Sequence, residues 1–568
     1  MTDSNNRPGA DGGDAVVSAF NAVGADYIFC SSGSEWAPVW ESLARRHRDG
    51  EPAPEYLDLT HETVAVGMAT GYGLVRRRPQ GVLLHAAPGL LQGSMAVHGA
   101  LLAGVPMVVT SSESTTYGDG PGQDPGGQWY RNLSIVGGPH HVAQPFTKWA
   151  NEAADISTLP TMITRAAELA WRAPAGPAYL NVPLEILLEE WDGREAKPIV
   201  PPGSMHSSPE EVDPVAQMIR EAKNPVVVTE TAGREAGGFE ALVAFAEAWE
   251  IPVVEPDSAV CGNFPRTHPL HAGSDIGPWM DEADLILLVN CRAPFYPPSR
   301  RPSKAKIVVI DQVPQRPHIV YQVLFADVYL EGNVANTLRQ LAKRAKDLDE
   351  SSVAARRAAQ EERHAAEQAA IAAAEAKAAQ SEGVDPVLVA ATLRKLLAGS
   401  GVVVDETITH SRVVKRHLQT ADPDSYFYVQ GGLGQGIAVA LGVKLAARER
   451  PVVLTIGDGA FTYNPVIPSY DAAKAYDLPV LIVVFNNRVY RSMNLNHRRF
   501  YPEGAAADTG EWLGTDLHRL PRLAGFAEPF GMHTETVDAA EALAPALERA
   551  LKAVSEGTTA VVDVLVTR

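Results

Sequence analysis

The most informative stretch of the 568-residue chain begins Pro451-Val-Val-Leu-Thr-Ile-Gly-Asp-Gly459 and resumes, after an Ala-containing segment, as Leu481-Ile-Val-Val-Phe-Asn-Asn487. Each apolar run is short and rich in β-branched residues, which predicts a buried strand of a parallel sheet. Asp458 and Asn487 therefore follow the carboxyl ends of two strands. Open α/β sheets bind ligands at that edge, so we expect a ligand site there.

The same alternation of apolar strand and Ala-rich helix extends over the whole chain. It predicts an α/β protein with three doubly wound parallel-sheet domains: an N-terminal domain over residues 1–192, a middle domain over 205–344 and a C-terminal domain over 384–568. Residues 345–383 are rich in Ala, Glu, Arg and Gln and lack a sustained heptad of Leu or Ile. That composition favours a solvated helical linker over a partner-binding coiled coil.

Composition excludes several classes of protein. The 49 basic and 68 acidic side chains give a net charge of −19, which argues against a nucleic-acid binder. The longest apolar run is far too short to span a membrane. Three cysteines without CxxC spacing argue against a disulfide framework or zinc site and favour a cytoplasmic location. The polar residues 1–14 predict a frayed tail rather than a signal peptide.

Asp458 and Asn487 carry hard oxygen atoms, which suit Mg²⁺ or Ca²⁺. The glycines beside Asp458 would let backbone amides approach a diphosphate. Alone, the Gly-Asp-Gly tripeptide is typical of an ordinary strand–turn–helix with a capping Asp. Together with the paired Asn after the second strand, it favours a metal and diphosphate site.

This arrangement resembles the thiamine-diphosphate-dependent decarboxylase and lyase family, whose signature is a Gly-Asp-Gly followed some 25–30 residues later by a paired Asn. The resemblance implies a pyrimidine-binding N-terminal domain, a Rossmann-like middle domain and a diphosphate-binding C-terminal domain. It implies thiamine diphosphate and Mg²⁺ as cofactors, with the metal held by Asp458, Asn487 and the carbonyl of Val489. Further cofactor contacts implied by it are Glu406, Thr407, Thr409, His410, Gly431, Leu433, Gly457, Gly459, Ala460 and Tyr490, where Leu433 would prop the cofactor in its bent conformation.

The sequence His61-Glu62 opens a predicted helix over 63–73 and resembles the family segment that contains the activating glutamate. Glu62 is thus the expected catalytic carboxylate, hydrogen-bonded to the aminopyrimidine ring. An acid favourable to the helix dipole is the structural alternative. In the family this glutamate reaches the cofactor of another subunit, which implies a homodimer or a dimer of dimers such as a homotetramer.

The substrate is less well specified. His85 and Ser34 match positions that line the pocket in benzoylformate decarboxylase, where they handle proton transfer and the substrate carboxylate, although the second pocket histidine expected near 294–299 is absent. A structural histidine is the alternative for His85. We predict a 2-oxo acid decarboxylase or carboligase, like benzoylformate decarboxylase or acetolactate synthase. The middle domain shows no clear flavin fingerprint, so FAD is not expected.

Two other functions stay open. A 2-hydroxyacyl-CoA lyase or oxalyl-CoA decarboxylase would need a site for nucleotide phosphates, and two basic clusters could supply it: Arg300-Arg301 with Lys304 and Lys306, and His497-Arg498-Arg499. Solvated surface arginines are the simpler interpretation of both. A non-catalytic scaffold or cofactor sensor is the other rival. Residues 489–516, which are rich in aromatic side chains, are the candidate substrate-closing element.

Overall fold

The computed structural model describes residues 9–116, 126–346 and 348–567, and the chain divides into two compact units. One unit comprises Met1–Pro202, Val429–Arg448 and Tyr463–Leu478. The other comprises Gly203–Tyr428, Glu449–Thr462 and Pro479–Arg568. Within the described residues, the structure has three β-sheets whose strand pairs are all parallel, as the sequence predicts.

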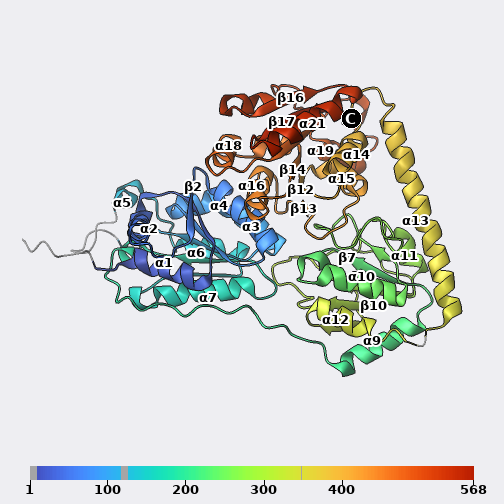
Figure 1. Cartoon of the computed structure of the whole chain (residues 1–568), viewed down its shortest axis with the longest axis horizontal. Coiled ribbons are helices and arrows are strands. Elements are labelled where there is room, and N and C mark those ends of the chain that lie inside the picture. The colour runs from blue at the N-terminus through green and yellow to red at the C-terminus, as the bar shows by residue number, and fades with distance from the viewer. Residues whose placement is uncertain (1–8, 117–125, 347, 568) are drawn as a thin grey trace, which may run out of the picture. The chain divides into compact units, whose positions relative to one another are not determined.

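The first sheet has the strand order β2-β1-β3-β4-β6-β5. Helices α1 and α7 cover one of its faces, and α3 packs on the other (Figure 1). Tyr72 of α3 lies against Phe29 of β1. The strands are β1 (Tyr27–Ser31), β2 (Glu55–Leu59), β3 (Gln80–Leu84), β4 (Met107–Ser111), β5 (Trp149–Glu152) and β6 (Pro177–Asn181). The main helices are α1 (Gly12–Val23), α2 (Ala37–Asp49), α3 (Glu62–Arg76), α4 (Ala86–Ala103) and α7 (Leu159–Trp171), with shorter α5 (Gly127–Arg131), α6 (Pro139–Ala143) and α8 (Leu184–Leu187).

The prediction of a frayed tail over residues 1–14 is wrong for the last residues of that range. Asp11 caps α1: its side chain accepts hydrogen bonds from the amides of Gly13 and Asp14, and the Asp14 carboxylate accepts one from the amide of Asp11. This capping box satisfies donors that would otherwise be unpaired at the start of the helix, so these polar residues are ordered. Residues 1–8 of the predicted tail lie outside the described part of the chain.

Helices α16 (Gly436–Ala446) and α18 (Val466–Ala475) belong to the same compact unit as the first sheet. Helix α16 packs directly on α3. A Cβ added at Gly71 of α3 would lie 2.0 Å from the carbonyl oxygen of Val439 on α16, so only glycine allows the two helix backbones to come this close.

The middle sheet has the order β11-β10-β9-β7-β8. Its central strand β9 is the apolar run 285–289, buried throughout, because helices cover both faces of a parallel sheet. The strands are β7 (Pro225–Thr229), β8 (Val253–Val254), β9 (Leu285–Val289), β10 (Lys306–Asp311) and β11 (Val328–Glu331). The helices are α9 (Pro209–Glu221), α10 (Gly238–Trp249), α11 (Gly277–Glu282) and α12 (Val334–Ala342).

The third sheet has the order β13-β12-β14-β15-β17-β16, which repeats the topology of the first. Its strands are β12 (Val402–Glu406), β13 (Tyr426–Tyr428), β14 (Val452–Gly457), β15 (Leu481–Asn486), β16 (His533–Val537) and β17 (Ala560–Leu565). Helices in this part of the chain are α14 (Pro386–Leu397), α15 (Ser411–Leu418), α17 (Asp458–Tyr463), α19 (Arg491–Phe500), α20 (Ala505–Thr509) and α21 (Ala540–Ser555).

The predicted linker over 345–383 contains one long helix, α13 (Glu350–Ala378), drawn in yellow in Figure 1. The exact domain boundaries stay predictions. Among the residues that the structure describes, none of the helices has the length and apolar character of a membrane span.

Candidate active site

In each sheet the strand order reverses beside its first strand: between β1 and β3, between β7 and β9, and between β12 and β14. Such a switch point leaves a crevice at the carboxyl ends of the two strands, because the loops that follow them leave in opposite directions. The predicted site residues lie at these ends. Ser34 follows β1 and His85 follows β3 in the first sheet, while Thr407 follows β12 and Asp458 follows β14 in the third.

The third sheet brings the predicted metal ligands to one edge. Strands β14 and β15 pair in parallel, with Gly457 opposite Phe485, so Asp458 and Asn487 follow neighbouring strand ends. Both side chains are buried, 4% and 7% exposed. The Oδ1 atom of Asp458 accepts a hydrogen bond from the amide of Gly459 (2.7 Å), and its Oδ2 atom accepts one from the amide of Arg488 (2.6 Å).

Burial raises the pKa of Asp458 to about 6, since a carboxylate removed from water is costly unless a cation or hydrogen bonds compensate it. The Oδ1 atom of Asn487 accepts a hydrogen bond of 2.9 Å from the Val489 amide, and the Val489 carbonyl accepts one of 2.8 Å from the Arg491 amide. Each of these oxygens has a second lone pair for a metal. The described residues contain no group of three His, Cys, Asp or Glu side chains that could hold a metal, but one carboxylate, one amide and one carbonyl fit Mg²⁺ with phosphate and water completing its shell.

Gly459 is required by packing. A Cβ at this position would lie 2.3 Å from Cε1 of Tyr490, whereas one at Gly457 would have nothing closer than the Thr407 carbonyl at 3.6 Å. Tyr490 therefore lies directly against the Gly459 backbone. Ala460, the next residue of α17, is buried. The four cofactor-site predictions Gly457, Gly459, Ala460 and Tyr490 thus fall on one strand–turn–helix and the aromatic ring that packs on it.

The predicted diphosphate contacts follow β12. Glu406 and Thr407 are buried, and Asp405 accepts hydrogen bonds from the Thr407 amide (3.0 Å) and hydroxyl (2.7 Å). Thr409 and His410 lie on a short 3₁₀ turn before α15. Burial lowers the pKa of His410 to about 4, with the positive charge of Arg491 acting in the same direction, so its imidazole is neutral at physiological pH. The Asn487 amide nitrogen is 3.5 Å from Nε2 of His410, which joins this turn to the predicted metal-ligand pair.

The other predicted residues lie in the compact unit of the first sheet. Glu62 is the first residue of α3, and a Cβ added at Gly89 of α4 would lie 3.3 Å from its Oε1 atom. The absence of a side chain at Gly89 leaves room for the Glu62 carboxylate. Gly431 has a positive φ of 87° and approaches the backbone of Gly99 on α4, while Leu433 is partly exposed.

Models of three domains match the chain: the N-terminal TPP binding domain of thiamine pyrophosphate enzymes over residues 10–141, their central domain over 212–341 and their C-terminal TPP binding domain over 407–564. The chain belongs to the thiamine pyrophosphate enzyme family. It is therefore a thiamine-diphosphate-dependent enzyme with the three α/β domains that the sequence predicts.

Curated relatives of this thiamine pyrophosphate enzyme include the benzoylformate decarboxylase of Pseudomonas aeruginosa, 26% identical over 83% of this chain and 84% of the relative. The sulfoacetaldehyde acetyltransferase of Castellaniella defragrans is 26% identical over 98% of this chain and 93% of its own. Acetolactate synthases are also among the relatives. A solved structure of a thiamine diphosphate-dependent 4-hydroxybenzoylformate decarboxylase from Rhodococcus jostii superimposes with a TM-score of 0.77 at 22% identity, covering 98% of this chain and 99% of that one.

Glu35 is the residue of the enzyme's first sheet that sequence reasoning missed. Its side chain is fully buried, and Oε1 accepts hydrogen bonds from Nδ1 of His85 (2.8 Å) and from the amide of Ala86 (2.9 Å). The hydrogen bond to Glu35 raises the pKa of His85 above its ordinary value, against the opposing effect of burial. Because Nδ1 donates to the carboxylate, Nε2 is the nitrogen left to exchange a proton with a ligand. Ser34, beside Glu35, is exposed.

A signal for this pair was present in the sequence, since Glu35 directly follows Ser34 in the segment after β1. The sequence did not show that Glu35 meets His85. That contact depends on the pairing of β1 with β3, which places the two strand ends side by side, with Cys30 opposite Leu83.

Several arginines of the two basic clusters of the enzyme contact other side chains. Arg300 pairs with Asp281 at 3.3 Å, and Arg301 stacks over Phe325. In the second cluster Arg498 stacks over Trp512, while Arg499 donates a hydrogen bond of 2.8 Å to the hydroxyl of Tyr296 in the middle domain. Helix α19, which carries the second cluster, has no buried residue. The structure therefore brings the predicted closing element next to the loop that carries the first cluster.

Proposed function

We propose that the enzyme is a 2-oxo acid decarboxylase or carboligase that uses thiamine diphosphate with Mg²⁺. The observation that carries this proposal is the hydrogen-bonded pair of His85 and Glu35 at the switch point of the first sheet, on the edge where Glu62 also begins its helix. A 2-oxo acid reaction needs a group that holds the substrate carboxylate and a group that gives and takes protons, and an imidazole fixed by a buried carboxylate suits both needs.

The residues would divide the work as follows. When bound, thiamine diphosphate supplies the carbanion chemistry that the side chains cannot perform. Glu62 would hydrogen-bond the aminopyrimidine ring and hold the proton that activates it. His85 would present Nε2 to the substrate, and the Ser34 hydroxyl would donate a hydrogen bond to the substrate carboxylate.

Asp458, Asn487 and the carbonyl of Val489 would hold Mg²⁺, which would neutralise the diphosphate. The buried Asp458, whose pKa is raised to about 6, supports this role because a cation offsets the cost of burying its charge. Glu406, Thr407, Thr409, His410, Gly431, Leu433, Gly457, Gly459, Ala460 and Tyr490 complete the proposed cofactor site.

The family resemblance extends the proposal to a homodimer or dimer of dimers in the cytoplasm. Large apolar side chains exposed on the compact unit of the first sheet support an interface between subunits: Leu91 (53%), Met95 (40%), Tyr463 (61%) and Ile467 (66%). The three cysteines, all buried and free, are compatible with a reducing compartment.

The second candidate is an enzyme that acts on a 2-hydroxyacyl-CoA or oxalyl-CoA thioester. It is favoured by the hydrogen bond between Arg499 and Tyr296, which brings α19 beside the loop of Arg300 and Arg301. Cations from two elements would then face a nucleotide's phosphates.

Two measurements test these functions. Thermal melting with thiamine diphosphate and Mg²⁺, each alone and together, should show stabilisation only when both are present, since ligands of the folded state raise stability by mass action. No stabilisation would overturn the cofactor site and favour a scaffold. Turnover should then be followed on a panel of 2-oxo acids, by CO₂ release and ligation to aldehydes, beside 2-hydroxyacyl-CoA thioesters. Activity on the thioesters alone would overturn the first candidate in favour of the second.

A further inference from the structure

Helix α15 follows directly on the turn that carries Thr407, Thr409 and His410. The basic side chains of α15 bind partners that lie outside the third sheet. Lys415 is 95% buried, and its Nζ atom donates hydrogen bonds to the carbonyls of Asp257 (2.5 Å) and Ala259 (3.1 Å) in a loop of the middle domain. Arg412, one turn earlier, pairs with the carboxylate of Asp257 at 2.8 Å.

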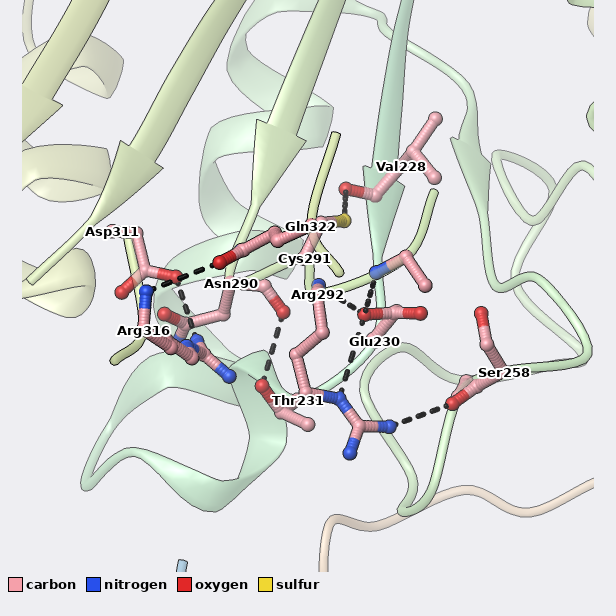
Figure 2. A network of polar contacts seen from close by, with 12 residues as sticks. Val228, Glu230, Thr231, Ser258, Asn290, Cys291, Arg292, Asp311, Arg316 and Gln322 are labelled. Carbon is pink, nitrogen blue, oxygen red and sulfur yellow. Dashed lines mark hydrogen bonds and ion pairs between the residues drawn. The ribbon is translucent and has the colours of Figure 1, made fainter. Parts of the chain in front are cut away.

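The same loop is held from its other side. Figure 2 shows Arg292, which follows β9 at the switch point of the middle sheet, donating a hydrogen bond of 3.1 Å to the carbonyl of Ser258. The buried Glu230, which follows β7, accepts hydrogen bonds from the amides of Arg292 and Ala293 and lies 3.6 Å from the Arg292 guanidinium. The loop 257–259 is therefore fixed between the middle sheet and α15.

The second anchor of α15 is the long helix α13. Arg416 makes two parallel hydrogen bonds to the carboxylate of Glu367 (2.8 and 2.9 Å). Nδ1 of the buried His417 is 2.9 Å from Oε1 of Glu375, and the same carboxylate accepts two hydrogen bonds of 2.8 Å from Arg394 of α14. Bidentate pairs of this kind fix orientation as well as distance.

Helix α13 is itself attached to the middle domain by its first half. Arg356 donates hydrogen bonds to the carbonyls of Ala222 (3.1 Å) and Trp249 (3.2 Å), and Gln360 donates to those of Pro269 and His271 (both 3.2 Å). A continuous set of polar contacts thus runs from the middle domain, through α13 and the loop 257–259, to α15.

We propose that Glu367 and Glu375 are positioning residues for the cofactor. By holding α15, they set the geometry of residues 406–410 and therefore the affinity for the diphosphate. Both carboxylates bind side chains of α15, so they act through the helix. This inference rests on the proposed function, in which residues 406–410 contact the diphosphate.

The chain contains a matched control. Glu535 lies on β16, the edge strand of the third sheet opposite β13. Like Glu375, it accepts hydrogen bonds from one arginine and one histidine, Arg549 and His533, the latter at 2.8 Å. The two glutamate side chains are similarly buried, 17% and 19% exposed. Removing the charge of either should therefore have a similar effect on the fold, but only Glu375 lies on the route to residues 406–410.

The full-length wild-type enzyme, Glu375→Gln and Glu535→Gln should be compared by calorimetric titration with thiamine diphosphate in the presence of Mg²⁺, by thermal melting without cofactor and by kcat at saturating cofactor. We expect the two variants to melt alike. Only Glu375→Gln should raise the cofactor Kd, by roughly 5- to 20-fold, in the lower part of the range of about 5- to 150-fold that is typical of coupling between linked sites, with kcat within about twofold of wild type. Equal cofactor Kd values for the two variants would overturn the inference, whereas a wild-type chain that does not bind the cofactor would overturn the proposed function instead.

A charge exchange gives an independent check if Glu375→Gln does not fold. Glu367→Arg places two arginines together and should weaken cofactor binding, and the double variant with Arg416→Glu should restore it. A single variant that folds and keeps the wild-type Kd, or a double variant that folds but fails to restore it, would contradict the positioning role.

Discussion

Replacing Glu35 with Gln tests whether the buried carboxylate controls the charge of His85. The change keeps the shape of the side chain and removes its charge, while the carbonyl oxygen of Gln can still accept one hydrogen bond. A hydrogen bond to a charged group contributes about 1.5–3 kcal/mol. The 2.8 Å bond between Glu35 and His85 should therefore favour the protonated imidazole by a free energy of about that size, which raises the pKa of His85.

The sign follows from the physical causes. The Glu35 carboxylate raises the pKa of His85, burial lowers it and the charge of Glu62 raises it. Removing the Glu35 carboxylate takes away the largest of these effects, so the pKa of His85 should fall. Because the raised pKa belongs to the folded state, the pair stabilises the fold at low pH, and this stabilisation is lost as the pH rises through the folded-state pKa. In Glu35→Gln the extra stability at low pH should disappear.

The assay is a proton NMR titration of the imidazole C–H signals, with His85 assigned from the spectrum of His85→Asn. Glu535→Gln serves as the control, since it removes an equivalent 2.8 Å contact from His533 and should leave His85 unchanged. A pKa of His85 in Glu35→Gln that is equal to or higher than in the wild type would refute the reasoning. In the active enzyme the corresponding limb of the pH profile of kcat/KM should move down by the same amount.

Three further predictions concern the proposed cofactor site. Glu62→Gln should bind thiamine diphosphate about as tightly as the wild type but lower kcat roughly 10²- to 10⁴-fold, the usual contribution of a proton-transferring group; unchanged turnover would remove Glu62 from the mechanism. Asp458→Ala should lose the stabilisation that the cofactor gives only with Mg²⁺, and a variant that still melts at the wild-type cofactor-bound temperature would rule out a metal ligand there. Gly459→Ala should destabilise the fold by about 1–3 kcal/mol in urea titrations because its Cβ meets Tyr490 at 2.3 Å, whereas Gly457→Ala, with nothing closer than 3.6 Å, should cost less.

Local sequence was enough to predict the three parallel sheets and the position of Asp458 and Asn487. Strands buried on both faces need continuous apolar runs, and consecutive parallel strands end at the same edge, so residues that follow two such runs must come together. Glu62, at the start of its helix, was predicted from the resemblance of residues 61–73 to the family segment that contains the activating glutamate. These features depend on contacts within one or two neighbouring elements.

Only the tertiary structure decided the rest. The pairing of β1 with β3 brings Glu35 to His85, and no periodicity along the chain marks that contact. The packing of α16 on α3, which makes Gly71 indispensable, joins segments more than 350 residues apart. The attachment of α15 to α13 and to the loop 257–259 depends on ion pairs and backbone carbonyls whose partners a charge count cannot identify. Sequence alone determined which chemistry the chain carries; the way its elements pack decided which buried charges support that chemistry, because burial and pairing are properties of the folded state.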